Sequence, residues 1–199
     1  MKKITALLLS LAMIASLSAC DSDENRSSQN TIKTETIVVT TIETTEKHFD
    51  TESFKKRIAD FNDTVYAAGV LLSNAGNYES NYIDARYSFS GRVNDEPEEI
   101  YRKAIIFLME EATPDMNMSE TKLEDDYNAI CKEYADIKAT DSNIQELSAI
   151  RDEYEALFDG YTALYEVVSN PPISSFNSRF NEQVRAVEDA NSKLKAFLN

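Results

Sequence analysis

From residue 54 onward the apolar side chains of this chain recur every three or four residues, which is the period of an amphipathic α-helix. The first such series comprises Phe54, Ile58, Phe61, Val65, Ala68 and Leu72. Only residues 36–42 have a strand-like, β-branched composition, and no second run of this kind is available to pair with them. The pattern therefore predicts an all-α fold.

Interruptions of the apolar series divide this region into helices. Residues 74–77, Asn-Ala-Gly-Asn, weaken helix propensity, and apolar residues resume over 78–89, so one long helix and two stacked helices both fit. A helix is expected to begin at Pro97, because proline suits the first helical position and two glutamates follow it. Its segment 104–109 is apolar on every side and is expected to be the most buried element.

The C-terminal half is expected to hold three more helices. Thr121 with Glu124, and Ser142 with Gln145, have the spacing of capping boxes at helix starts. Residues 170–172, Asn-Pro-Pro, force a turn between the last two helices. These two helices, of about 26 to 28 residues each, would form an antiparallel hairpin some 40 Å long. The expected fold is an antiparallel up-and-down bundle of four or five helices.

The N-terminal 19 residues have the composition of a secretory signal peptide: two early lysines, an apolar run over residues 4–17, and no acid. The apolar run is shorter than the roughly 20 residues that a membrane-spanning helix needs. Residues 17–20, Leu-Ser-Ala-Cys, resemble the bacterial lipobox. This resemblance implies transfer of a diacylglyceryl group to the Cys20 thiol and cleavage between Ala19 and Cys20.

The sequence thus predicts three segments: a lipoprotein signal peptide at 1–19, a lipidated flexible tether at 20–47, and a helical bundle at 48–199. The tether is rich in Ser, Thr, Asn and Glu, a composition with too little apolar surface to fold. If it is flexible, it reaches about 30 Å. Residues 36–42 within it could add as a strand to a partner or stay extended. The expected location is the extracytoplasmic face of the cell membrane, held through the lipid on Cys20.

The layout is similar to that of a set of uncharacterised lipoproteins of Gram-positive bacteria, with a lipobox, a Ser/Thr/Glu tether and a helical domain. The matching parts are the lipobox, residues 77–82 (Asn-Tyr-Glu-Ser-Asn-Tyr) and residues 170–176 (Asn-Pro-Pro-Ile-Ser-Ser-Phe). The resemblance implies this architecture and no particular activity.

The formal net charge is −15 and becomes −17 when residues 1–19, with two lysines and no acid, are removed. This excess of acid argues against nucleic acid as a partner, because phosphates need Lys and Arg. Basic proteins or cations are better suited than nucleic acid to the negative electrostatic field of this chain. The excess of negative charge also favours solubility. Cys131 has no disulfide partner if Cys20 carries lipid, and it is expected to be a small buried thiol.

No catalytic or cofactor-binding pattern is visible. His48 is the single histidine, at the junction of tether and bundle, so His-based nucleophilic and transition-metal sites are not expected. The acidic runs 110–115 and 120–126 lack the spacing and glycine of a calcium loop. Glu79 and Glu111 come closest to placing an acid within a core stripe. We therefore expect no cofactor, no metal and no enzymatic activity.

Aromatic residues are the candidates for binding. Tyr78, Tyr82, Arg86 and Tyr87 lie close together among Asn and Ser residues, a composition that suits recognition. Tyr78 and Tyr82 also fall on the expected apolar stripe, which favours a core role for them. Tyr87 and Arg86 lie off the stripe and are the better surface candidates.

Four hypotheses for function follow from this sequence. The first is an anchored interaction module for an envelope or secreted protein, and the second is a glycan- or solute-binding lipoprotein. The third is a prophage-type exclusion lipoprotein that blocks an incoming injection machine. The fourth is a cell-wall-acting enzyme, which would need two acids facing each other across a cleft.

Overall fold

A computed structural model describes residues 49–111, 119, 121–141 and 147–199 of the chain. The chain divides into two units, Met1–Glu46 and Lys47–Asn199, and the second unit contains all the described residues. The expected lipidation and cleavage sites at Cys20 and Ala19, the possible strand at 36–42 and His48 lie outside the described residues. So does the capping box expected at 142–145.

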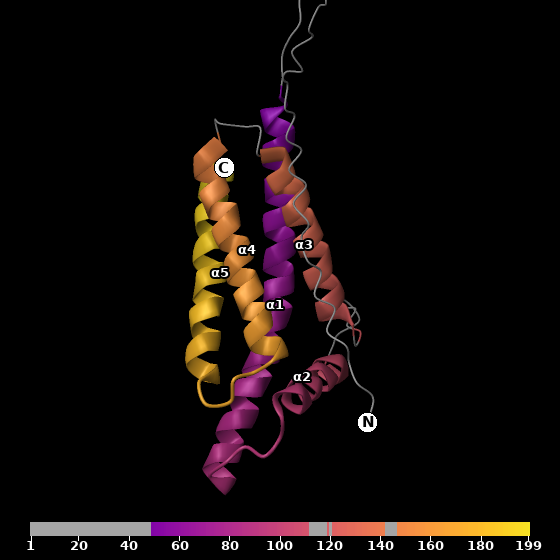
Figure 1. Cartoon of the computed structure of the whole chain (residues 1–199), viewed down its shortest axis with the longest axis vertical. Coiled ribbons are helices and arrows are strands. Elements are labelled where there is room, and N and C mark those ends of the chain that lie inside the picture. Colours follow the sequence, from indigo (N-terminus) through magenta and orange to yellow (C-terminus); the bar gives the residue numbers. More distant parts are fainter. Residues whose placement is uncertain (1–48, 112–118, 120, 142–146) are drawn as a thin grey trace, which may run out of the picture. The chain divides into compact units, whose positions relative to one another are not determined.

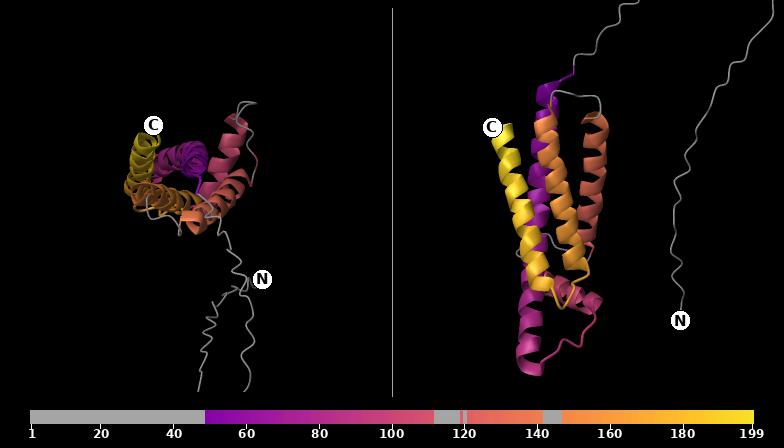
Figure 2. Two further views of the ribbon diagram at one scale, coloured as in Figure 1. Left: turned by 90° about the horizontal axis from the view of Figure 1, so that it is seen from above. Right: turned by 60° about the vertical axis from the view of Figure 1, so that its left-hand side comes forward.

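The second unit is an all-α bundle, as the apolar period predicts, and the described residues contain no strand. Its helices are α1 (Thr51–Ser90), α2 (Pro97–Glu111), α3 (Lys122–Asp141), α4 (Ser148–Ser169) and α5 (Phe176–Leu198). Helices α1, α3, α4 and α5 run alternately up and down along the bundle, and the shorter α2 crosses it obliquely near one end (Figures 1 and 2). Helix α1 contacts all four other helices.

Helix α1 is continuous over 40 residues, which answers the question left open by the weak segment 74–77. Its start is capped by Asp50, whose Oδ1 accepts the Ser53 backbone N–H at 3.0 Å. Its end is closed by Gly91, which adopts a left-handed conformation with φ of 71° and donates its N–H to the Tyr87 carbonyl.

Because α1 is continuous, the face that it buries after residue 74 differs from the face expected from the sequence. The expected stripe after residue 77 contained Tyr78, Tyr82, Ala85 and Phe89. The buried positions of this part of α1 are instead Ala75, Gly76, Glu79 and Ile83. The period set by the first half of the helix is carried through without a restart, because no break resets its phase. Tyr78 and Tyr82 lie beside this stripe and are half-buried, facing α2.

Helices α4 and α5 form the expected antiparallel hairpin, with 22 and 23 residues in place of the 26 to 28 expected. The turn is longer than expected because α5 begins only at Phe176, so Ile173 belongs to the turn. Within this turn the Ser175 N–H donates to the Pro172 carbonyl at 2.9 Å. The hairpin makes the most extensive helix–helix contact of the bundle.

Stacked aromatic rings join α3 to α4. The rings of Tyr134 and Phe158 have centroids 3.9 Å apart, and those of Tyr127 and Tyr165 are 4.0 Å apart. Tyr127 and Tyr134 are seven residues apart on α3, so they lie on the same face of that helix. Cys131, on the same helix, is half-buried and not the fully buried thiol that was expected.

The ends of α3 also hold polar contacts. At its C-terminus the buried Asp141 accepts hydrogen bonds from Arg151 Nε at 2.5 Å and from the Tyr154 hydroxyl at 2.8 Å, which ties α3 to α4. At its N-terminus the Thr121 hydroxyl donates a hydrogen bond to Asp125 at 3.2 Å, and no capping-box hydrogen bond between Thr121 and Glu124 is found among the described residues.

The prediction that 104–109 would be the most buried segment is wrong. Ala104, Ile105 and Leu108 are buried, but Ile106, Phe107 and Met109 are exposed. Helix α2 makes its main contacts with α1 and α4. A helix covered on one side buries one face only, however apolar its other face is.

Candidate functional site

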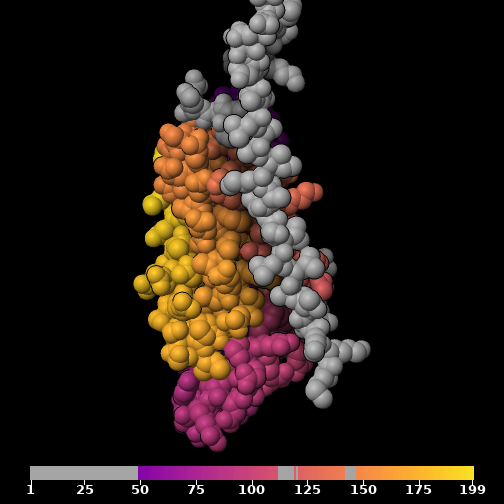
Figure 3. Space-filling model, viewed as in Figure 1, coloured from indigo at the N-terminus to yellow at the C-terminus, as the bar shows by residue number. Residues whose placement is uncertain are grey.

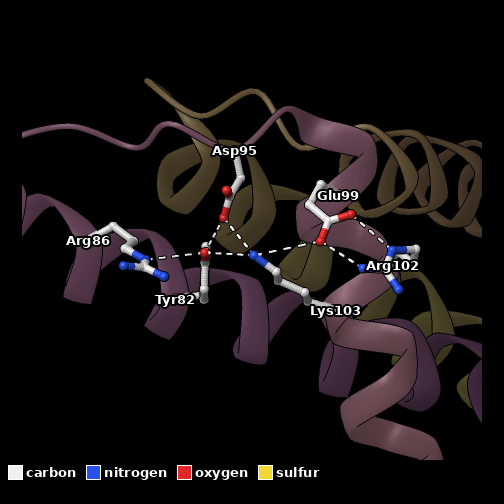
Figure 4. A network of polar contacts seen from close by, with 6 residues as sticks. All are labelled: Tyr82, Arg86, Asp95, Glu99, Arg102 and Lys103. Atoms are coloured by element: carbon white, nitrogen blue, oxygen red, sulfur yellow. Dashed lines mark hydrogen bonds and ion pairs between the residues drawn. The ribbon is translucent and has the colours of Figure 1, made fainter.

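Tyr82, one of the tyrosines that the sequence singled out, lies where α1 approaches α2, within a polar network (Figure 4). The Tyr82 hydroxyl donates a hydrogen bond to Asp95 and accepts one from Lys103 Nζ at 3.0 Å. Lys103 Nζ also donates to Asp95 Oδ2 at 2.7 Å. Hydrogen bonds from Lys103 and from Tyr82 hold the pKa of Asp95 below its ordinary value. The network therefore fastens the loop before α2, and α2 itself, to α1.

Two cations lie over the face of the Tyr82 ring. Arg86 Cζ is 5.1 Å and Lys103 Nζ is 4.9 Å from its centroid, distances at which cation–π attraction operates. Arg86 Nε also donates to the Tyr82 hydroxyl at 3.2 Å. Arg86 is exposed, but its guanidinium is engaged by its own helix, so it is less available to a partner than the sequence suggested.

Tyr78 has a packing role as well. Its ring stacks on Phe107 of α2, with centroids 4.8 Å apart, and on Tyr82 at 6.2 Å. Both Tyr78 and Tyr82 thus serve the α1–α2 contact, in line with the core role that the apolar spacing favoured for them.

Tyr87 is separate from this network and is 44 % exposed. It lines a groove of about 700 Å³ formed mainly by the C-terminal half of α4, the α4–α5 turn and the start of α5. The apolar lining consists of Pro97, Ala163, Val167, Pro171, Pro172 and Ile173. The lining residues whose side chains carry polar or charged groups are Tyr87, Glu166, Asn170, Ser174, Arg179 and Gln183. The structure thus brings one of the four candidate tyrosine and arginine residues to a concave surface.

The sequence analysis missed most of this groove. Its signal was the Asn-Pro-Pro turn at 170–172, which the sequence analysis used only to end a helix. Arg179 and Glu166 come to the groove from two helices and carry no local sequence signature. Their juxtaposition follows from the packing of α4 against α5.

Beyond the groove, α1 continues past the α4–α5 turn as a projecting tip, residues 84–90 (Figures 2 and 3). Every residue of this tip is exposed, and Phe89 is 91 % exposed. The sequence assigned Ala85 and Phe89 to the core stripe because their spacing is helical. The assignment is wrong, because the neighbouring helices end before they reach this part of α1.

Glu79 of α1 is the polar group most unusual for its surroundings. It has no exposed surface, and neither carboxyl oxygen has a hydrogen-bond partner among the described residues. Burial alone raises the pKa of Glu79 to about 9. The pKa of Tyr101 rises to about 12, mainly through burial and in smaller part through the nearby Tyr165 and Glu79. The sequence had named Glu79 as an acid close to a core stripe.

Two common kinds of site are not found in the parts of the chain that the structure describes. No three His, Cys, Asp or Glu side chains lie close enough there to hold a metal ion. No helix in those parts combines the length and apolar character needed to cross a membrane. Comparisons with protein-family models, with curated proteins and with solved structures gave no match to this chain.

Proposed function

We propose that this chain is a lipid-anchored extracytoplasmic binding protein that recognises an envelope or secreted protein with the end of its bundle at which α1 ends. The lipobox-like residues 17–20 and the Ser/Thr-rich stretch after them support the anchor. The net charge of −15 supports a protein partner with basic groups over nucleic acid.

The exposed tip of α1 is the observation that carries this proposal. Phe89 and Tyr87 are two aromatic side chains with large exposed surface at a projecting helix end. Exposed aromatic side chains do not stabilise the free protein, whereas aromatic anchors carry much of the energy of protein interfaces. The tip holds one acid, Asp84, and one cation, Arg86, so its aromatic side chains distinguish it from the rest of the surface.

The length of α1 separates the tip from the point at which the chain enters the bundle. The chain enters the bundle at the N-terminus of α1, and Tyr87 lies 36 residues further along the same helix, which is roughly 55 Å at 1.5 Å per residue. An anchor attached before α1 would therefore leave the tip far from the point of attachment. A lipid anchor before α1 and a recognition surface where α1 ends would suit capture of partners away from the membrane.

The groove beside Tyr87 favours the second hypothesis, a lipoprotein that binds a small ligand. Its volume of about 700 Å³ falls within the range of roughly 300 to 1,000 Å³ of ordinary ligand sites. An enzyme with paired acids is not favoured, because Glu166 is the one carboxylate among the described residues that lines the groove.

Replacing Phe89 with serine is expected to weaken capture of the protein partner about 30-fold, the effect of losing about 2 kcal/mol at an aromatic anchor. The measurement is quantitative crosslinking or proximity labelling from the anchored protein in its own cell. Phe197→Ser is the matched control, because Phe197 is also about half exposed (48 %) but lies near the C-terminus of α5. Equal loss of capture in both variants, or in neither, would count against the tip.

Replacing Cys20 with serine is expected to move the protein from the membrane fraction to the soluble fraction, because the thiol that would receive the lipid is gone. Cys131→Ser is the control and should stay in the membrane fraction, since the chain has two cysteines. Retention of Cys20→Ser in the membrane fraction would rule out the lipid anchor.

A further inference from the structure

We infer that the groove beside Tyr87 binds a short peptide with two free ends, its carboxylate at Arg179 and its amine at Glu166. This inference goes beyond the proposed tip function and develops the second candidate, a small ligand in the groove, by naming the class of ligand. Its basis is a pair of opposite charges that line one groove from two helices without joining each other.

Glu166 and Arg179 lie at about the same level on α4 and α5. The packing of Gly160 against Val187 sets the register of this hairpin, and the two charged residues follow six and eight positions away towards the turn. Both line the groove. Arg179 makes no ion pair within 4.0 Å with any residue that the structure describes, and neither does Glu166. A space between the two charges therefore remains open to a ligand.

Arg179 is one of several cations that form no ion pair with a residue that the structure describes, and among these cations it is the one that lines the groove. Of the arginines, Arg57, Arg102 and Arg151 form ion pairs with carboxylates, and so do lysines such as Lys103 and Lys122. An unpaired guanidinium offers a planar set of donors that matches a carboxylate in two parallel hydrogen bonds. Glu166 on the facing helix would repel a simple anion, so the site suits a ligand that also carries a positive group.

The remaining lining suits the body of a short peptide. Pro171, Pro172 and Ile173 give the groove a wall of apolar side chains whose proline rings are stiff and offer no N–H. The side-chain amides of Asn170 and Gln183 provide donors and acceptors for peptide groups. A tripeptide is roughly 10 Å long when extended and fits within about 700 Å³.

The test titrates the full-length protein, by calorimetry, with the tripeptide Ala-Leu-Ala and with its N-acetyl, C-amide and doubly blocked forms. The free peptide is expected to bind, and each single block is expected to weaken binding about tenfold. In Arg179→Gln the C-amide and the free acid should bind equally, and in Glu166→Gln N-acetylation should have no effect. Arg185→Gln, which removes an exposed arginine of the same helix outside the groove, should behave as the unaltered protein.

Three outcomes would overturn the inference: no binding of the free peptide up to about 10 mM, equal binding of the doubly blocked peptide, or an unchanged effect of amidation in Arg179→Gln. The tip variants separate this inference from the proposed function. If Phe89→Ser abolishes partner capture while no peptide binds, the ligand class is wrong and the function stands. If the peptides bind as expected while capture does not depend on Phe89, the peptide site stands and the tip proposal fails.

Discussion

Replacing Gly76 with alanine is expected to lower the free energy of unfolding by about 2 kcal/mol, although alanine is the better helix former by roughly 1 kcal/mol. A Cβ atom at position 76 would lie 2.1 Å from Cε2 of the Phe180 ring and 2.6 Å from two other ring atoms. Phe180 is buried and stacks on Phe176 with centroids 5.5 Å apart. The ring therefore has little room to move, and α5 would have to shift away from α1.

Gly69 provides the matched control on the same helix. A Cβ atom there would meet Cγ1 of Val187 at 3.6 Å, an ordinary contact, so Gly69→Ala is expected to leave stability unchanged or raise it by up to about 1 kcal/mol. Both variants would be measured by denaturant unfolding. Combining Gly76→Ala with Phe180→Leu should cost less than the sum of the two single changes, since the smaller side chain relieves the clash. Equal stabilities of Gly76→Ala and Gly69→Ala would show that the ring does not pack on residue 76.

Replacing Glu79 with glutamine is expected to stabilise the bundle at pH 7 by roughly 3 kcal/mol, with a strong dependence on pH. The pKa of Glu79 rises from an ordinary 4.5 to about 9 in the folded protein because the side chain is buried. Between these two pH values the folded state holds a proton that the unfolded chain releases. Its stability is therefore highest below about pH 4.5 and falls as the pH rises towards 9. Glutamine has about the same size as glutamic acid and does not release a proton in this pH range, so the pH-dependent loss of stability is absent from the variant.

The measurement is the free energy of unfolding of the unaltered protein and of Glu79→Gln between pH 4 and pH 8. The difference should be near zero at pH 4 and should grow steadily with pH. Glu110→Gln is the control, because it removes the same charge from an exposed position and should change stability by no more than about 0.5 kcal/mol at either pH. A constant difference for Glu79→Gln across this range would mean that the carboxyl is hydrated in the folded protein.

Much of the fold could be predicted from the sequence because helix formation has local signals. The three-to-four-residue period predicted the helices, Pro97 predicted the start of α2, and residues 170–172 predicted the turn between α4 and α5. The buried face of the second half of α1 was predicted wrongly, because the apolar series was taken to start afresh after the weak segment 74–77. Continuing the same period beyond Leu72 leads to Gly76, Glu79 and Ile83, which are the buried positions.

Gly76 illustrates why a local signal can mislead. In sequence it lowers helix propensity and suggests a break. In the structure it lies inside an unbroken helix and allows the Phe180 ring of α5 to pack closely against α1. The residue that most weakens the helix locally is thus the one that lets two helices pack closely. Only the position of α5 reveals this role.

The sequence by itself determined that this chain forms helices, where α2 and α3 begin, and which residues could be apolar contacts. Tertiary structure alone decided which of these residues are covered. Phe89 and Ile83 both have helical spacing, yet Ile83 is buried and Phe89 is exposed. The groove with Glu166 and Arg179 was likewise decided by the packing of α4 against α5. The physical reason is that periodicity is a property of one helix, whereas burial depends on where neighbouring helices lie and where they stop.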